Sequence, residues 1–494
     1  MSSNRRNFFK QTGLLAAGVV GFPAVVRSAD VAAVAPGSRP RNIIHLVADG
    51  MSSGTLTAAD YYSHFTRQRG LSWFDFAHRP GTHSAFVNMR SLNSFVTDSS
   101  AASSSWGSGS RVMNGALNQL PDGRNLRTLY QLFDELHWRR GLVTTTEITH
   151  ATPAGFATNS ASRGSADELA VQYLDRRVDV LLGGGKPFFD AGKRKDKRDL
   201  YADYRAAGYT VMTKAAELKA APLDARWLGT FSSGHLPYTV DRDQDVRLLK
   251  EVPSLATMTR LALGNLGRAD HFILQVEGGR VDHGAHANDI AASVGDMIAF
   301  DEALDVCLEF QARVPETLVV VTTDHGTANA GLNGSGSNYK DSPTLFANVL
   351  RVKASFEKME GDLKKPGTAA GIQKVLLKQT GYRVPDAKAA LLARVLEKKA
   401  DVMYDGMSSL SQQLGQLMAN YLGVGFTGGA HTADYMPLLA AGPGSERFRG
   451  FRQNVEVFRN YVDLVGIDYR NPEAPLVAES GPSADEVEFA ARLA

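Results

Sequence analysis

Short apolar runs rich in β-branched residues recur along the chain and constrain its fold more than any other feature. They are separated by stretches with helical spacing, and they have the length of strands that are buried on both faces of a sheet. Strands that alternate with helices in this way predict a doubly wound α/β fold, with a mostly parallel central sheet and helices on both faces. The runs are Asn42–Ala48, Gly141–Thr145, Val178–Leu182, Phe272–Val276, Leu318–Thr322 and Pro437–Ala441.

One stretch departs from this alternation. Residues 341–420 are rich in Lys and Leu and have few strand signals, and Leu410, Leu414 and Leu417 have helical spacing. We therefore expect a helical insertion at 341–420 in a catalytic domain made of residues 36–340 and 421–494. Whether the insertion is a lid, a dimer contact or a decoration stays open.

The amino-terminal segment has the order of an export signal. Two adjacent arginines, Arg5 and Arg6, precede an apolar run from Gly13 to Val26, which is too short to span a membrane. This order is typical of a signal peptide of the twin-arginine type, so residues 1–35 are expected to be a signal peptide and disordered N-terminus. The prediction is a periplasmic or secreted protein with no transmembrane span in the mature chain.

Charge and cysteine content narrow the choice of function. The chain has 54 Lys and Arg residues against 52 Asp and Glu residues, so it lacks the basic excess that nucleic-acid binding requires. Its one cysteine, Cys307, cannot form an intrachain disulfide and is expected to be a buried, inert thiol.

Carboxylates and histidines gather where the predicted strands end. Ligands of such folds bind at the carboxyl ends of the strands, and Asp and His together suit Zn²⁺. Asp282 and His286 are one helical turn apart, so both could face one metal if a helix begins there. The sequence therefore predicts metal binding by a set of side chains at this edge. The set is Asp49, Glu277, Asp282, His286, Asp324, His325 and His431.

A serine-rich segment, Val96–Trp106, offers a nucleophile. It could be a flexible linker, but Val and Thr precede the serines and small helix-forming residues follow them. A serine at the start of a helix lies where backbone N–H groups favour a phosphate, and a nearby Zn²⁺ would lower its pKa. Asp98 or Ser100 could cap the helix instead. Arg163 has a guanidinium that can hold two phosphate oxygens.

Together these motifs resemble the alkaline phosphatase family in its zinc-dependent form with an Asp-Ser nucleophile. The resemblance runs from about Asn42 to Pro443, outside the insertion, and the order and spacing of the motifs match throughout. The segments that carry it are Ala48–Met51, Val96–Trp106, Asn114–Ala116, Thr149–Arg163, Gln275–Asn288, Thr323–Gly326 and Gly428–Thr432.

The resemblance implies hydrolysis of small-molecule phosphate monoesters through a phosphoserine on Ser99, with Arg163 clamping the phosphate. It also implies two Zn²⁺ and one Mg²⁺ as cofactors, and a homodimer, as is common in the family. The implied ligands are Asp282, His286 and His431 for one zinc; Asp49, Asp324, His325 and Ser99 for the second; and Asp49, Thr152 and Glu277 for the magnesium.

Two positions depart from the best-known bacterial members of that family. They have Asp and Lys near the third metal and the phosphate, where this chain has His150 and His283, as animal enzymes do. The identity of the third metal therefore stays open.

Two other functions are compatible with parts of the sequence. A phosphodiesterase or sulfatase of the same superfamily is one alternative, although Cys307 does not lie in the Cys-x-Pro-x-Arg stretch of sulfatases. A non-catalytic exported metal-binding protein is the other, and it leaves the Ser99 and Arg163 motifs unexplained.

Overall fold

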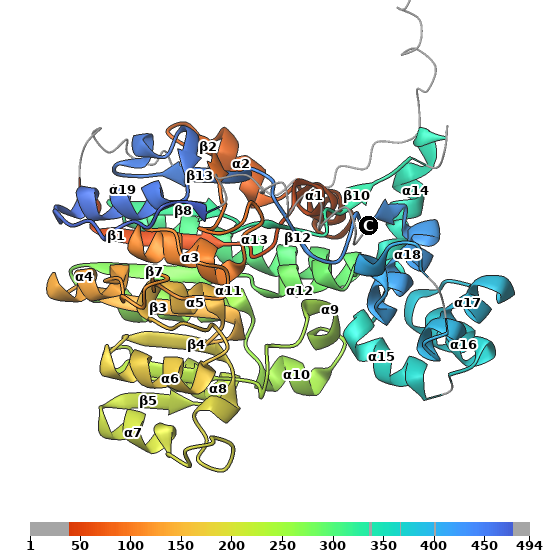
Figure 1. The fold of residues 1–494 in the computed structure, drawn as a ribbon, viewed down its shortest axis with the longest axis horizontal. Helices are drawn as coiled ribbons and strands as arrows, with labels where there is room; N and C mark the ends of the chain where they lie inside the picture. Colours follow the sequence, from red (N-terminus) through yellow and green to blue (C-terminus); the bar gives the residue numbers. More distant parts are fainter. Residues whose placement is uncertain (1–38, 335–337, 366, 400–401, 478–494) are drawn as a thin grey trace, which may run out of the picture. The chain divides into compact units, whose positions relative to one another are not determined.

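The expected strands occupy the middle of one large sheet (Figure 1). The computed structural model describes residues 39–477 except 335–337, 366 and 400–401, and this described part contains a ten-stranded sheet. Each predicted run overlaps a strand. In sheet order the strands are β14 (Gly450–Gln453), β2 (His83–Asn88), β13 (Met436–Ala441), β8 (Thr317–Thr322), β1 (Asn42–Val47), β7 (Phe272–Glu277), β3 (Arg139–Glu147), β4 (Val180–Gly184), β6 (Arg226–Thr230) and β5 (Tyr209–Met212).

The sheet is mostly parallel, which confirms the predicted doubly wound fold. Strand β13 runs antiparallel to both of its neighbours, β2 and β8, and the other neighbouring strands pair in parallel. Strands β1, β7 and β8 are buried along their whole length, as their continuous apolar sequences predict.

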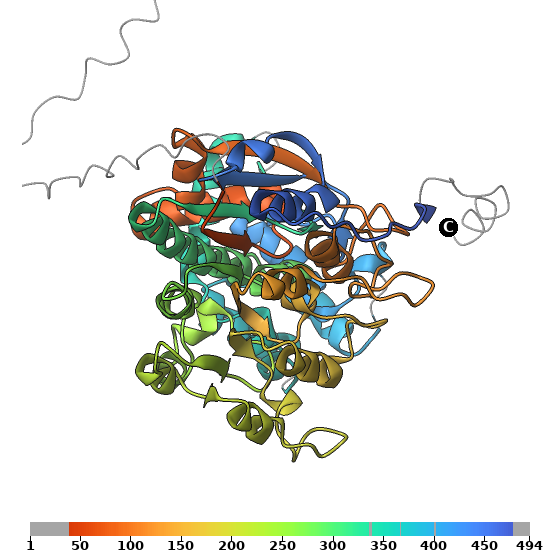
Figure 2. The same cartoon turned by 90° about the vertical axis from the view of Figure 1, so that its left-hand side faces the viewer.

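Helices cover both faces of the sheet (Figure 2), and each face has its own apolar core. Successive side chains of β1 enter opposite cores, so Ile44 and Leu46 belong to one and Ile43 and Val47 to the other. The first core includes side chains of α1 (Ser53–Arg67), α2 (Ser72–His78), α11 (Leu255–Leu266) and α13 (Ile290–Arg313); the second includes those of α3 (Ser99–Ser108), α4 (Leu129–Glu135), α5 (Ala151–Ala157), α6 (Ala166–Asp175), α7 (Leu200–Ala206) and α19 (Val455–Val465).

Helices also make up most of the stretch between residues 341 and 422. Apolar side chains of these helices, including Phe356, Leu363 and Leu414, are buried and continuous with the first core. The helices are α14 (Ser342–Phe346), α15 (Phe356–Lys364), α16 (Ala369–Thr380), α17 (Asp386–Leu396) and α18 (Leu410–Leu422).

Two short antiparallel ladders bring the ends of this helical stretch together. Strand β10 (Gly331–Leu332) pairs with β11 (Val424–Gly425), and β9 (Gly326–Thr327) pairs with β12 (His431–Thr432). The chain therefore leaves the end of β8, forms the helices and returns to the same place, so that His431 lies opposite Thr327.

The predicted export segment, residues 1–35, lies outside the described residues. Among the residues that are described, no helix is both long enough and apolar enough to cross a membrane.

Candidate functional site

Three carboxylates meet because three neighbouring strands end together. In the register of the sheet, Val47 of β1 lies beside Glu277 of β7 on one side and Thr322 of β8 on the other. Asp49 follows Val47 by two residues and Asp324 follows Thr322 by two, so backbone pairing alone places Asp49, Glu277 and Asp324 side by side. All three are fully buried.

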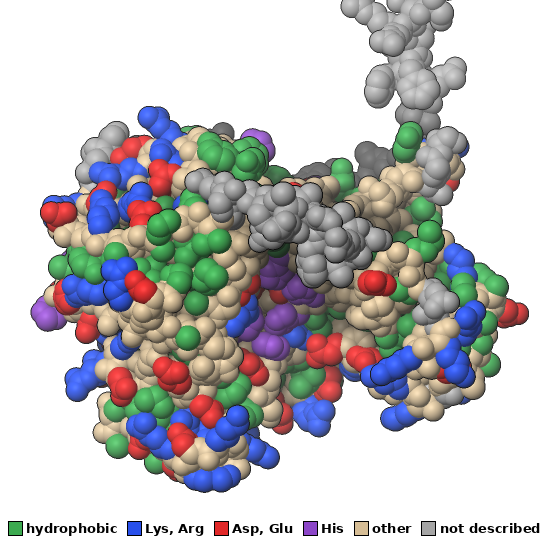
Figure 3. Space-filling view, viewed as in Figure 1, with side chains coloured by type: hydrophobic (Ala, Val, Ile, Leu, Met, Phe, Trp, Pro, Cys, Tyr) green, Lys and Arg blue, Asp and Glu red, His purple; other side chains and the backbone are tan. Residues whose placement is uncertain are grey.

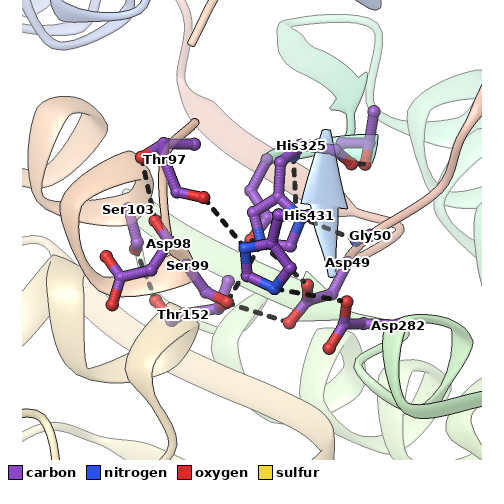
Figure 4. Close-up of polar contacts among 12 residues, drawn as sticks. Asp49, Gly50, Thr97, Asp98, Ser99, Ser103, Thr152, Asp282, His325 and His431 are labelled. Carbon is purple, nitrogen blue, oxygen red and sulfur yellow. Dashed lines mark hydrogen bonds and ion pairs between the residues drawn. The ribbon is translucent and has the colours of Figure 1, made fainter. Parts of the chain in front are cut away.

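Ser99 is the first residue of α3 and lies near Asp49 (Figure 4). Asp98 caps the helix, because its side chain accepts a hydrogen bond from the backbone N–H of Ala101. The hydroxyl oxygen of Ser99 is 3.2 Å from Nε2 of His325. The positive end of the helix and its free N–H groups therefore face the space into which Ser99 points.

Asp282, His286 and His431 form the first group of possible metal ligands. The expected helix is present as α12 (Arg280–His286), and it brings Nε2 of His286 to 3.4 Å from Oδ2 of Asp282. Nε2 of His431, on β12, is 3.0 Å from Nε2 of His286. The Nδ1 atoms of the two histidines bond the carbonyls of Gly429 and Thr97. These bonds leave Nε2 of each ring available to a metal.

Asp49, Asp324 and His325 form the second group. Nε2 of His325 is 3.1 Å from Oδ2 of Asp324 and 3.7 Å from Oδ1 of Asp49. The hydroxyl of Thr327 donates to Asp282 at 2.6 Å and lies 3.2 Å from Nδ1 of His325, so it connects this group to the first.

The third group shares Asp49 and adds His150 and Glu277. Nδ1 of His150 is 3.9 Å from Oε1 of Glu277, and the hydroxyl of Thr152 donates to Oδ2 of Asp49 at 3.5 Å. Thr144 also donates to Glu277, on its other carboxylate oxygen. All the side chains that were expected at a third metal therefore lie together.

Arg163 lies beside the serine helix. Its Nη1 donates to Asp98 at 3.1 Å and its Nη2 donates to Nε2 of His150 at 3.1 Å. Burial would raise the pKa of Asp98, but Arg163 and the helix N–H groups lower it overall. Asp98 therefore stays ionised, holds Arg163 and caps the helix of Ser99 at the same time.

Burial and the crowding of like charges act most strongly on Asp49. Burial, and then the nearby Asp324, Asp282 and Glu277, raise the pKa of Asp49 well above its usual range. Burial also lowers the pKa of His431 to about 4, helped by the neighbouring His325. A neutral imidazole beside crowded carboxylates is the state that binds a cation.

The donor set fits metal ions. Among the described residues, Oδ1 of Asp49 and Oε1 of Glu277 are buried without a hydrogen-bond donor. A buried oxygen without a partner destabilises the folded state, and a metal cation that binds the oxygen removes this penalty. Mixed Asp and His ligands in the first two groups suit Zn²⁺, and the oxygen-rich third group suits Mg²⁺.

A histidine that the motifs did not indicate adjoins the site. His235, in the loop between β6 and α9 (Thr239–Arg242), accepts a hydrogen bond at Nδ1 from the backbone N–H of Glu147. Its ring centroid is 4.4 Å from that of His283, and the ring of His283 is 5.5 Å from that of His150. No local pattern surrounds His235, so only the fold shows that it belongs here.

Fold and site together define an α/β enzyme that carries a serine and clustered metal-binding side chains at the carboxyl edge of its sheet. The family model described as alkaline phosphatase matches residues 40–466. Alkaline phosphatase 3 of Bacillus subtilis is 30% identical over 432 residues, which cover 85% of this chain and 88% of the relative. Streptomycin-6-phosphate phosphatase of Streptomyces griseus is 31% identical over 72% of this chain and 86% of its own.

The crystal structure of Thermus thermophilus alkaline phosphatase is similar over 93% of this chain and 96% of its own, with 34% identity and a TM-score of 0.82. The chain belongs to the alkaline phosphatase family. It is therefore a phosphatase enzyme, and its family implies hydrolysis of phosphate monoesters.

Proposed function

We propose that this enzyme hydrolyses phosphate monoesters through a phosphoserine on Ser99, at a site that holds two Zn²⁺ and one Mg²⁺. The observation that carries the proposal is the position of Ser99. It begins a helix, it adjoins the ligand groups, and Arg163 lies beside it.

The three ligand groups divide the metals between them. When bound, the ions supply positive charge that stabilises oxygen anions during phosphoryl transfer. The ligands are Asp282, His286 and His431 for one zinc; Asp49, Asp324 and His325, with Ser99, for the other; and Asp49, Thr152 and Glu277 for the magnesium, with His150 and His283 close by.

The residues of the chain position and transfer the phosphoryl group. The oxygen of Ser99 attacks phosphorus in line, the bond to the alcohol oxygen breaks, and the hydroxyl proton of the serine ends on the departing alcohol. Water then attacks the phosphoserine and releases inorganic phosphate and the free serine. Arg163 holds two equatorial oxygens throughout, and Asp98 keeps its guanidinium in place.

Steady-state hydrolysis of p-nitrophenyl phosphate at alkaline pH tests this proposal. We expect chelation to abolish activity, Zn²⁺ to restore it and Mg²⁺ to increase it further. Bis(p-nitrophenyl) phosphate is the control substrate, and its turnover should be far slower. Equal rates on the diester, or full activity after complete chelation, would contradict the proposal.

The same add-back experiment addresses the third metal. His150 stands where an oxygen ligand would favour Mg²⁺ more strongly, and an imidazole suits Zn²⁺ as well. Stimulation by Mg²⁺ after saturation with Zn²⁺ supports magnesium there, and inhibition by Mg²⁺ would assign a third zinc.

A further inference from the structure

A cavity of about 360 Å³ opens between the core of the enzyme and the helical stretch of residues 341–422. The core side contributes His235, His283 and His286, and the other side contributes residues of α15 and α18. Figure 3 shows histidine side chains gathered in a hollow of the surface. The cavity has the size of a small-molecule site.

The cavity adjoins the catalytic site, because His286 lines it and also belongs to the first ligand group. Ser99 contacts His325, the ring of His325 stacks on that of His431 at 3.6 Å, and His431 contacts His286, which lines the cavity. The cavity therefore lies beside the place proposed for the phosphate of an ester at Ser99.

The charged side chains that line the cavity differ in their exposure to solvent. Arg280 is a lining residue, but its side chain is only 4% exposed, and its guanidinium lies 3.7 Å from the ring centroid of Tyr238. It also donates to His283 at 3.0 Å and pairs with Glu357 at 2.7 Å. The positive charge is thus enclosed by protein partners and is not presented to a ligand.

The carboxylates of α15 are open to the cavity side. The side chains of Glu357 and Glu360 are 66% and 46% exposed, and both line the cavity. Ser411 of α18 adds a hydroxyl, while Phe356 and Leu410 add apolar surface. Glu357 pairs with Arg280, and Glu360 pairs with Lys364 of the same helix. The wall made by α15 and α18 therefore offers exposed hydrogen-bond acceptors and partly compensated negative charge beside a place for carbon atoms.

We propose that this cavity binds the leaving alcohol of the substrate and selects alcohols that carry an ammonium group or several hydroxyls over alcohols that carry a second anionic group. This inference rests on the proposed function, because it concerns the same ester. It assigns Glu357 and Glu360 as specificity-determining residues, and Arg280 as a positioning residue that holds α15 against α12.

Sugar phosphates of equal carbon number and different charge test the selection. The measurement is kcat/KM of the metal-loaded enzyme for glucosamine 6-phosphate, glucose 6-phosphate and 6-phosphogluconate, each a primary alkyl ester. The expected order is cationic, then neutral, then anionic, with about five- to tenfold between the extremes, as partly exposed charge contacts produce.

Variants distinguish an effect of the cavity on substrate selection from a general effect on activity. Glu360→Gln should lower the ratio of the cationic to the anionic substrate about threefold, the effect of one partly exposed charge. Glu357→Gln should lower it further, because Arg280 then lacks its carboxylate. Glu397→Gln removes an exposed charge at the end of α17 and should keep the wild-type ratio.

A binding measurement on Ser99→Ala gives a second readout without turnover. In the Ser99→Ala background, calorimetry should show that Glu360→Gln weakens the binding of glucosamine 6-phosphate but leaves the binding of inorganic phosphate unchanged. Equal kcat/KM values for the three sugar phosphates, or a ratio that Glu360→Gln does not move, would overturn the cavity assignment. Absence of turnover on p-nitrophenyl phosphate as well would instead mean that the proposed function fails.

Discussion

The two sides of this site are built in different ways. On the sheet side, Asp49, Glu277 and Asp324 are fully buried and placed by the backbone register of three paired strands. On the helical side, Glu357 and Glu360 stand on one face of a short helix and are largely exposed. Buried groups whose positions are fixed by strand pairing suit a reaction that needs precise placement of its catalytic groups. Exposed groups on a helix can be substituted with little effect on the rest of the fold.

Replacing the nucleophile is the most severe test of the sheet side. Ser99→Ala should lower kcat by roughly 10³-fold or more, because no phosphoserine can form. Acid-quenched labelling with radioactive phosphate ester should detect a phosphoenzyme in the wild type alone.

Ser105→Ala is the matched control in the same helix, since the hydroxyl of Ser105 only bonds the carbonyl of Ala101. Its activity should stay near that of the wild type. Unchanged turnover in Ser99→Ala would exclude the covalent route.

Replacing the shared carboxylate tests whether a single side chain serves two metal sites. Asp49 belongs to two of the groups and Asp324 to one of them. Asp49→Ala should therefore lose metal from two sites, and Asp324→Ala from one, each with roughly 10²-fold or greater loss of activity. Elemental analysis of the purified variants measures the metals, and equal losses in both variants would contradict the sharing.

Arg163 should have a smaller effect, confined to phosphate affinity and orientation. Arg163→Ala is expected to weaken inhibition by inorganic phosphate about 10- to 100-fold, which corresponds to about 1.5–3 kcal/mol for charge-assisted hydrogen bonds. Arg163→Lys should recover only part of this loss, because an ammonium cannot hold two oxygens in a planar fork. Unaltered phosphate inhibition in Arg163→Ala would remove the clamp from the mechanism.

The smallest expected effect concerns the contact between the sheet side and the helical side of the site. Asp289 caps α13 and also accepts a hydrogen bond from the backbone N–H of Phe356, at the start of α15. Burial raises its pKa to about 7, although N–H donors act against the rise. The folded state then keeps a proton that the unfolded chain loses near pH 4, so its stability falls as pH rises from about 4 to 7 and levels off above.

Asp289→Asn should remove this part of the pH dependence. The free energy of unfolding by urea, measured at pH 5.5 and 8.0, should fall by about 2 kcal/mol more in the wild type than in the variant. Comparison of the two proteins cancels the effects of other titrating groups. Equal slopes would show that Asp289 is ionised in the folded state throughout this range.

Local patterns in the sequence predict the sheet side well. Continuous apolar runs identify β1, β7 and β8, and the polar residues directly after them are the ones that converge. The one-turn spacing of Asp282 and His286 likewise predicts their approach on α12. In each case a local pattern, either the end of an apolar run or the spacing of one helical turn, identifies the residue before its partners are known.

Four strands of the large sheet, β2, β5, β6 and β14, escaped prediction because they lack such runs. Strand β2 alternates buried and exposed residues, and β5 and β14 have only four residues each, at or near the edges of the sheet. Their burial depends on neighbours distant in sequence. The reversed direction of β13 depends on the long excursion of the chain before it, which leaves no mark in the strand itself.

Contacts between distant segments account for the rest of the site. His235 and Arg280 acquire their surroundings only when the loop after β6 and helices α12 and α15 pack together. The second role of Asp98, as the partner of Arg163, arises in the same way. Such residues carry no spacing rule, so a single sequence contains no signal for them.

The crowding of Asp49, Glu277 and Asp324 has a consequence for the tolerance of the enzyme to heat. The fold holds these carboxyl groups together before any cation arrives, and a ligand that binds only the folded chain stabilises it by an amount that grows with the logarithm of its concentration over its dissociation constant. Under the proposed assignment, the melting temperature follows the zinc supply of the surroundings. When zinc is scarce, activity is then lost both because the site lacks metal and because the folded state is less stable.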